Sequence, residues 1–133
     1  MKTKGTGFNL LIVDDERFIL DSLSGFLEDY DFSVFQADSA ESALEILEET
    51  GIDAAVVDLR LPVMSGETLI HTIHQRFPDI RFLIHTGSVG YKLTKDLKTI
   101  GLRDDHVFFK PVPDLSKLVE KLFSLLEENY GDT

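Results

Sequence analysis

Five side chains that could do chemistry each stand where a short apolar run of the sequence ends. Asp14 and Asp15 follow the first run, and Asp58 ends the third. Thr86 follows the fourth run and Lys110 the fifth. Carboxylates bind hard cations such as Mg²⁺, and an activated carboxylate can also attack as a nucleophile. A hydroxyl and an ammonium group can bind phosphoryl oxygens, so together these residues predict Mg²⁺-dependent phosphoryl chemistry.

The elements that must position these residues alternate regularly along the chain. Apolar runs at 8–13, 32–37, 52–58, 81–85 and 107–109 are each followed by apolar residues at helical spacing, at 19–30, 40–47, 69–77, 89–100 and 115–126. Most of the runs are continuous rather than alternating, which is typical of parallel strands covered by helices on both faces. With right-handed crossovers, this order predicts a doubly wound α/β sandwich of three layers.

In such a sheet, ligands bind outside the carboxyl ends of the strands. Asp14, Asp15, Asp58, Thr86 and Lys110 are therefore expected at one edge. Two carboxylates about 4 Å apart repel by roughly 4 kcal/mol at an effective dielectric constant of about 20. One lysine offsets only part of that repulsion, so a divalent cation held by oxygen ligands is expected among them.

Length and composition limit the class of protein. The chain has 133 residues, 43% of them hydrophobic, which fits one globular domain, expected at 8–128 with flexible ends at 1–7 and 129–133. The absence of Cys excludes disulfides, thiol catalysis and Cys-ligated metals. No apolar run is long enough to span a membrane, and the polar start does not resemble a signal peptide, so a cytoplasmic protein is expected. The net charge of −11 disfavours direct binding to nucleic acid.

Four segments resemble the receiver domain of bacterial two-component response regulators: VDDE, VVDLRLPVMSG, HTGS and FFKPV. The resemblance extends over about residues 8–128 and implies a flavodoxin-like fold with a five-stranded parallel sheet in the order 2-1-3-4-5. It implies that Asp58 is the phosphoacceptor nucleophile and that Thr86 and Lys110 contact the phosphoryl group. The implied Mg²⁺ ligands are Asp14, Asp15, Asp58 and the backbone carbonyl of Arg60. The resemblance also implies a cis Lys110-Pro111 peptide.

The same resemblance implies a signalling switch rather than an enzyme that turns over a separate substrate. Asp58 would accept a phosphoryl group from a sensor histidine kinase or a histidine phosphotransfer protein, and the domain would then dephosphorylate itself. The expected downstream partner is an effector protein or an output domain absent from this chain, and a phosphorylation-dependent dimer is compatible with the family.

One position departs from the family pattern. Receiver domains often carry an aromatic residue three positions before the lysine, whereas this chain has Val107. Val107 is too small and too stiff to act as a rotating ring. We therefore expect phosphorylation to change the conformation of the loop after Thr86, and the output surface to consist of a helix at 89–100 and the fifth strand. Tyr91 is expected to be exposed on that helix, and His85 to be a packing residue.

Three other functions fit the sequence less well. A flavodoxin-like cofactor binder would need a phosphate-cradling loop after the first strand, where Asp14, Asp15 and Glu16 would repel a phosphate. A Mg²⁺-dependent phosphohydrolase usually has a second carboxylate two residues after its nucleophile, and this chain has Arg60 there. A degenerate receiver that acts only by binding would not need all five site residues.

Overall fold

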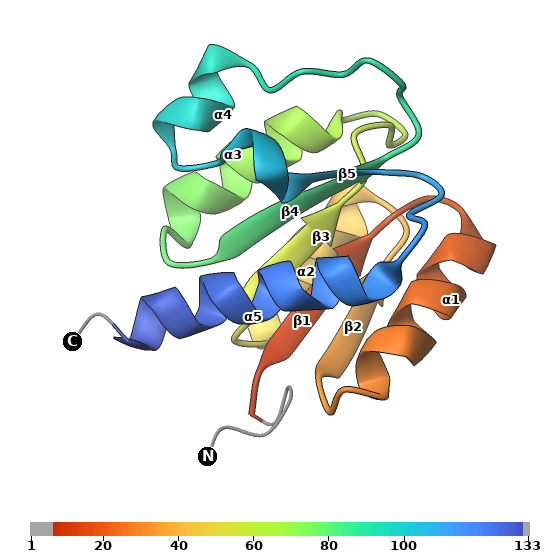
Figure 1. Ribbon diagram of the computed structural model, residues 1–133. Helices are drawn as coiled ribbons and strands as arrows, with labels where there is room; N and C mark the ends of the chain where they lie inside the picture. The colour runs from red at the N-terminus through yellow and green to blue at the C-terminus, as the bar shows by residue number, and fades with distance from the viewer. Residues whose placement is uncertain (1–6, 132–133) are drawn as a thin grey trace.

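The computed structural model describes residues 7–131, and their side chains up to residue 127. Strands and helices alternate along the chain, as predicted (Figure 1). The strands are β1 (Asn9–Val13), β2 (Ser33–Ala37), β3 (Ala54–Val57), β4 (Arg81–Thr86) and β5 (Val107–Phe109). The helices are α1 (Arg17–Glu28), α2 (Ala40–Glu49), α3 (Gly66–Arg76), α4 (Lys95–Thr99) and α5 (Leu115–Gly131), with a short 3₁₀ turn, η1 (Asp104–His106), before β5.

The five strands form one parallel sheet in the order β2-β1-β3-β4-β5. The register aligns the strand ends, since Val13 of β1 lies opposite Ala37 of β2 and Val57 of β3. The loops that follow these strands therefore emerge side by side at one edge. The predicted fold class and strand order are confirmed.

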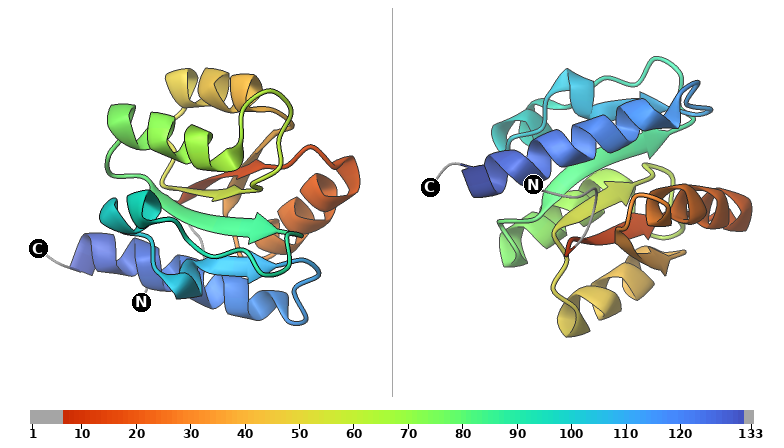
Figure 2. Two further views of the ribbon diagram at one scale, coloured as in Figure 1. Left: turned by 90° about the horizontal axis from the view of Figure 1, so that it is seen from above. Right: turned by 60° about the horizontal axis from the view of Figure 1, so that its bottom comes forward.

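Helices cover both faces of the sheet, which gives the three layers visible in Figure 2. On one face, α2, α3 and α4 pack against residues such as Leu11 and Ile84. On the other face, α1 and α5 pack against residues such as Leu10 and Leu83. Neighbouring residues of one strand thus enter different cores, which explains why the strands read as continuous apolar runs.

The fourth helix is shorter than the sequence predicts. The expected helix at 89–100 is wrong, because α4 begins only at Lys95, where the hydroxyl of Thr94 accepts a hydrogen bond from the Leu97 N–H. Gly90 has φ +86°, a backbone angle that interrupts a right-handed helix. Val89 is 92% exposed in the loop rather than part of a buried stripe, while Leu97 is buried as expected.

Close backbone packing joins the start of α3 to the end of β3. A Cβ atom at Gly66 would lie 2.2 Å from the carbonyl oxygen of Asp58, so only glycine fits there without a shift. The Gly66 N–H also donates to the carbonyl of Leu59 at 2.8 Å. This contact fixes the first turn of α3 against the loop that carries Asp58.

Some predictions concern the chain ends and membranes. Of the predicted flexible segments 1–7 and 129–133, residues 1–6 and 132–133 lie outside the described residues, whereas 129–131 belong to α5. The domain boundaries stay a prediction. Within the described part of the chain, no helix has the length and apolar character needed to cross a membrane.

Candidate functional site

Lys110 joins the loop after β5 to the two most buried carboxylates of the strand edge. Its Nζ lies 2.7 Å from Oδ2 of Asp14 and 3.3 Å from Oδ2 of Asp58. Backbone bonds set this geometry: the Lys110 N–H donates to the carbonyl of Thr86 at 2.8 Å, and the Asp58 N–H donates to that of Val13 at 2.9 Å. The structure thus brings residues from three separate loops into one contact. The Lys110-Pro111 peptide is cis, as the resemblance implied.

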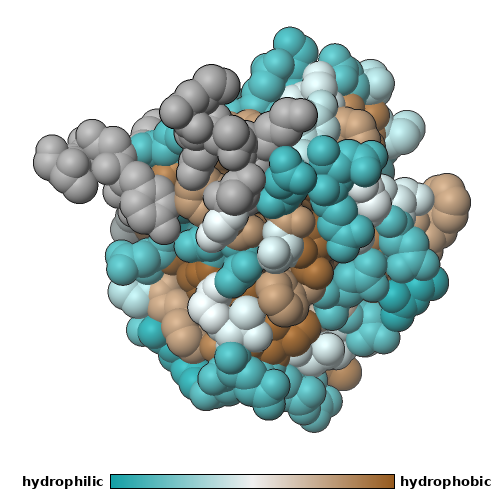
Figure 3. Space-filling model, turned by 90° about the horizontal axis from the view of Figure 1, so that it is seen from below, coloured by the Kyte–Doolittle hydropathy of each residue, from teal (hydrophilic) through white to brown (hydrophobic). Residues whose placement is uncertain are grey.

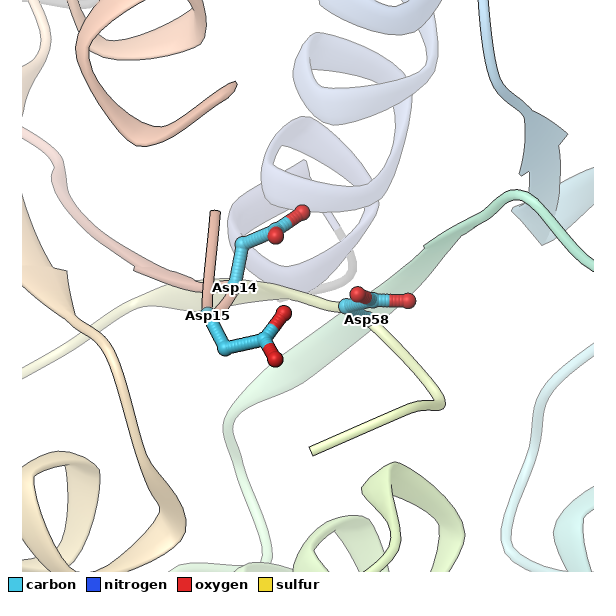
Figure 4. A group of neighbouring side chains, drawn as sticks. All are labelled: Asp14, Asp15 and Asp58. Atoms are coloured by element: carbon cyan, nitrogen blue, oxygen red, sulfur yellow. The ribbon is translucent and has the colours of Figure 1, made fainter. Parts of the chain in front are cut away.

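Three carboxylates gather beside this lysine. Oxygens of Asp14, Asp15 and Asp58 lie within 4.8 Å of one another, and Figure 4 shows the three side chains together, two from the loop after β1 and one from the end of β3. Asp14 and Asp58 are 1% and 5% exposed, whereas Asp15 is open to solvent. Three carboxylates and one ammonium leave two uncompensated negative charges, which one divalent cation would cancel.

Burial and neighbouring charges perturb the titration of this group. Burial raises the pKa of the Asp58 carboxyl; the charge of Lys110 opposes that rise and the charge of Asp14 adds to it. Burial works to lower the pKa of Lys110, but its hydrogen bond to Asp14 and the two carboxylate charges outweigh burial and raise that pKa. Lys110 therefore stays protonated. Its single positive charge does not fully offset the effects of burial and of Asp14, so the pKa of Asp58 stays raised.

Thr86 ends β4, beside β3, and is fully buried. Its hydroxyl oxygen accepts a hydrogen bond from the Ser88 N–H at 3.1 Å. The backbone N–H of Arg60 donates to Oδ1 of Asp58 at 3.4 Å, and the Arg60 side chain reaches back to Ser88. The loops after β3 and β4 are therefore tied together. The carbonyl of Arg60 as a metal ligand stays a prediction.

Neighbouring residues of β5 face opposite sides of the sheet. Val107 packs toward the core under α2, α3 and α4, and Phe108 toward the core under α1 and α5. His85 is buried, as predicted for a packing residue. Its burial, reinforced by the nearby charge of Lys110, lowers its pKa to about 4.

Two contacts of this edge were not foreseen from the sequence. Glu16 lies 3.8 Å from the Lys110 ammonium. The hydroxyl of Tyr91 donates a hydrogen bond to the carboxylate of Glu67 in α3. Tyr91 is half-buried, so the prediction that it is exposed on a helix is wrong. Neither contact has a sequence spacing that signals it.

At the opposite edge, where the strands begin, the described residues form no comparable cluster of carboxylates. A hollow of about 510 Å³ lies there between the ends of α2 and α3, and an ion pair joins Arg76 to Glu48 at its wall. Figure 3 views the molecule from below, where apolar side chains reach the surface between hydrophilic ones. Among the described residues, the carboxylate cluster of Asp14, Asp15 and Asp58 is the one group of this kind that could hold a metal ion.

The sequence matches a known protein family over most of its length. A family model for the response regulator receiver domain matches residues 10–123. This chain belongs to the response regulator receiver domain family. Receiver domains are signalling switches that act through phospho-aspartate in two-component systems.

Relatives of this receiver domain include regulatory proteins and solved receiver structures. The regulatory protein VanR of Enterococcus faecium is 37% identical in an alignment of 122 residues that covers 85% of this chain and 49% of VanR. A CheY-like receiver domain protein of Methanospirillum hungatei is 28% identical with a TM-score of 0.79, covering 95% of this chain and 98% of its own. The response regulator TrrA of Thermotoga maritima, solved with Mg²⁺-BeF, shares the fold at 23% identity and a TM-score of 0.75, over 89% of this chain and 98% of TrrA.

This receiver domain is similar to only part of the longer relatives. It spans between 12% and 54% of the length of four curated proteins that it matches. The activities of those whole proteins therefore do not pass to this chain directly.

Proposed function

We propose that this receiver domain is a phosphorylation switch that accepts a phosphoryl group on Asp58 from a phosphohistidine. The donor would be a sensor histidine kinase or a histidine phosphotransfer protein. The observation that carries the proposal is the contact of 3.3 Å between Lys110 Nζ and the buried carboxylate of Asp58, beside two further aspartates. A structural carboxylate at the end of a strand would have no need for two acidic neighbours and a lysine ammonium.

The transfer step forms one bond and breaks one. A carboxylate oxygen of Asp58 attacks phosphorus, and the bond between phosphorus and the imidazole nitrogen of the donor breaks. The imidazole keeps the electron pair of that bond and takes a proton from water. The product is an acyl phosphate on Asp58, which water later hydrolyses to restore the carboxylate and release inorganic phosphate. The domain would thus reset itself and turn over no separate substrate.

The carboxylate cluster fits Mg²⁺, because its donors are hard oxygens and its net charge matches a divalent cation. Asp14, Asp15, Asp58 and the carbonyl of Arg60 would hold the ion. Asp14 already accepts hydrogen bonds on both oxygens, from the Glu16 N–H at 3.0 Å and from Lys110 at 2.7 Å. We therefore expect Asp14 to act mainly through water and the exposed Asp15 to bind directly. When bound, the ion would supply positive charge to the transferring phosphoryl oxygens.

Lys110 and Thr86 would hold the remaining phosphoryl oxygens. The Lys110 ammonium has three N–H donors, and its contacts to Asp14 and Asp58 hold it beside the carboxylate that would carry the phosphoryl group. The Thr86 hydroxyl accepts from Ser88 and still has its own proton to donate. The readout would be a change of shape in the loop after Thr86, α4 and β5, recognised by an effector protein or an output domain.

Intact-mass measurement after incubation with Mg²⁺ and acetyl phosphate tests the proposed function. The wild-type protein should gain one phosphoryl group, and the gain should disappear with EDTA and in Asp58→Asn. The matched control is Asp79→Asn, an exposed aspartate before β4, which should gain mass as the wild type does. A gain that survives in Asp58→Asn would move the acceptor elsewhere.

A further inference from the structure

Ser88 connects the proposed phosphoacceptor loop to the loop before α4 through three hydrogen bonds. Its N–H donates to the hydroxyl oxygen of Thr86 at 3.1 Å. Its own hydroxyl accepts from Nε of Arg60 at 3.1 Å. Its carbonyl accepts from the Tyr91 N–H at 3.1 Å, which closes a turn over residues 88–91. The position of this turn therefore depends on Arg60, two residues after Asp58, and on Thr86 at the end of β4.

The far end of the turn is held by a side chain. The Tyr91 hydroxyl donates to the carboxylate of Glu67, in the first turn of α3. Burial and this bond raise the pKa of the Tyr91 phenol, so the hydroxyl keeps its proton as a donor. The Tyr91 ring packs against the same core as Val107. This aromatic ring belongs to the loop after β4, whereas β5 contributes Val107 to the same core.

Both ends of this arrangement are anchored to the backbone around Asp58. Arg60 follows Asp58 by two residues, and α3 begins at Gly66, where a Cβ atom would meet the Asp58 carbonyl at 2.2 Å. Between the anchors the loop is deformable. Gly87 and Gly90 flank the half-buried Ser88 and the exposed Val89, and Gly90 has φ +86°.

We propose that residues 88–91 form a latch, closed by the hydrogen bond of Tyr91 to Glu67 and opened by a phosphoryl group on Asp58. The inference rests on the proposed role of Asp58. A phosphoryl group is a stronger acceptor than the neutral Ser88 hydroxyl, so the Arg60 guanidinium leaves Ser88 for it. The Thr86 hydroxyl moves toward the same group and pulls away from the Ser88 N–H. Ser88 loses both of its anchors, the turn shifts about the glycines, and Tyr91 separates from Glu67.

Opening has a defined chemical consequence at the surface. The half-buried ring of Tyr91 becomes accessible next to Val89, which is already 92% exposed. The Glu67 carboxylate is released to solvent at the same time. Phosphorylation would thus create an apolar, aromatic surface at residues 88–91. It would do so although β5 has Val107, and not an aromatic residue, three positions before Lys110.

Nuclear magnetic resonance on protein with carbon-13-labelled tyrosine rings tests the latch, with beryllofluoride and Mg²⁺ standing in for the phosphoryl group. Tyr91→Phe identifies the Tyr91 signal by its loss. Beryllofluoride should shift that signal and leave Tyr30, two residues after the end of α1, unchanged. Without beryllofluoride, Tyr91→Phe should speed amide exchange at residues 88–94 about fivefold, the factor that the loss of one hydrogen bond produces. Glu67→Gln keeps an acceptor oxygen and should exchange more slowly than Tyr91→Phe, and Tyr30→Phe should match the wild type.

The outcomes separate the latch from the proposed function. If beryllofluoride shifts the amide signals around Asp58 but leaves Tyr91 and the exchange at residues 88–94 unchanged, the latch is wrong and the phosphoacceptor stands. If beryllofluoride shifts nothing and acetyl phosphate adds no mass, both are overturned.

Discussion

The ammonium nitrogen of Lys110 lies 3.3 Å from Oδ2 of Asp58, although the two residues are 52 positions apart in sequence. The contact is buried, with the Lys110 side chain 14% and the Asp58 side chain 6% exposed. Only the parallel order of β3, β4 and β5 brings the two loops together. The fold therefore places one lysine against the buried carboxylates of Asp14 and Asp58 at the edge of the sheet.

Removal of that counter-ion should destabilise the fold. We expect Lys110→Met to lower the free energy of unfolding by about 3 kcal/mol at neutral pH without Mg²⁺, because it leaves Asp14 and Asp58 buried without a cation. Urea denaturation measures the effect, and added Mg²⁺ should recover part of the loss. The control is Lys117→Met, whose side chain is 67% exposed and which should change stability by less than about 0.5 kcal/mol. Equal effects of the two substitutions would contradict a structural ion pair.

The close approach of α3 to Asp58 gives a second test. Gly66→Ala should cost about 2 kcal/mol, because its Cβ would meet backbone atoms of Asp58 and Leu59 that cannot rotate away. It should also slow phosphorylation by displacing Asp58. Gly25→Ala in α1 is the matched control: its Cβ meets nothing within 4 Å, so it should stabilise the protein by up to about 1 kcal/mol. A Gly66→Ala protein as stable as the wild type would mean that this packing is looser than the structure indicates.

The main parts of the site were predictable because topology does the positioning. Asp14, Asp58, Thr86 and Lys110 each stand at the end of an apolar run, and parallel strands carry all their ends to one edge. No distance had to be known for that inference. The alternation of Val107 and Phe108 between two cores follows from the same strand geometry.

The loop before α4 could not be predicted in the same way. Val89, Leu93, Leu97 and Ile100 have helical spacing, yet the turn at Gly90 and the cap at Thr94 restrict the helix to its last part. The contacts from Ser88 to Arg60 and from Tyr91 to Glu67 join positions 28 and 24 residues apart without any periodic pattern. Such side-chain contacts depend on the detailed course of loops, which hydrophobic periodicity does not describe.

His85 should make the fold sensitive to acid. Its pKa in the folded protein is lowered to about 4 from an ordinary value of 6.5. Between these values the unfolded chain binds a proton that the folded protein does not, so the stabilising contribution is complete above pH 6.5 and is lost as pH falls toward 4. Urea denaturation across this range should show a shallower loss of stability for His85→Met than for the wild type, and His74→Met on α3 should follow the wild type. Parallel curves for all three proteins would contradict this role of His85.

Mg²⁺ should stabilise the folded protein if the carboxylates bind it. A ligand that binds only the folded state adds about 2.7 kcal/mol at a hundredfold excess over its Kd. The thermal unfolding midpoint should therefore rise with added Mg²⁺, and Asp15→Ala should abolish the rise. Asp79→Ala, which removes an exposed carboxylate away from the site, should leave the rise intact. A thermal unfolding midpoint that does not change with millimolar Mg²⁺ would argue against a metal site at this edge of the sheet.

The central claim is that Asp58 carries the phosphoryl group, and chemical trapping tests it most directly. Borohydride reduces an aspartyl phosphate to homoserine, which leaves a permanent mass change at the modified residue. After incubation with Mg²⁺ and acetyl phosphate, reduction and peptide sequencing by mass spectrometry should place homoserine at position 58 alone. Homoserine at Asp14, at Asp15 or at any other aspartate, with Asp58 unmodified, would contradict the account.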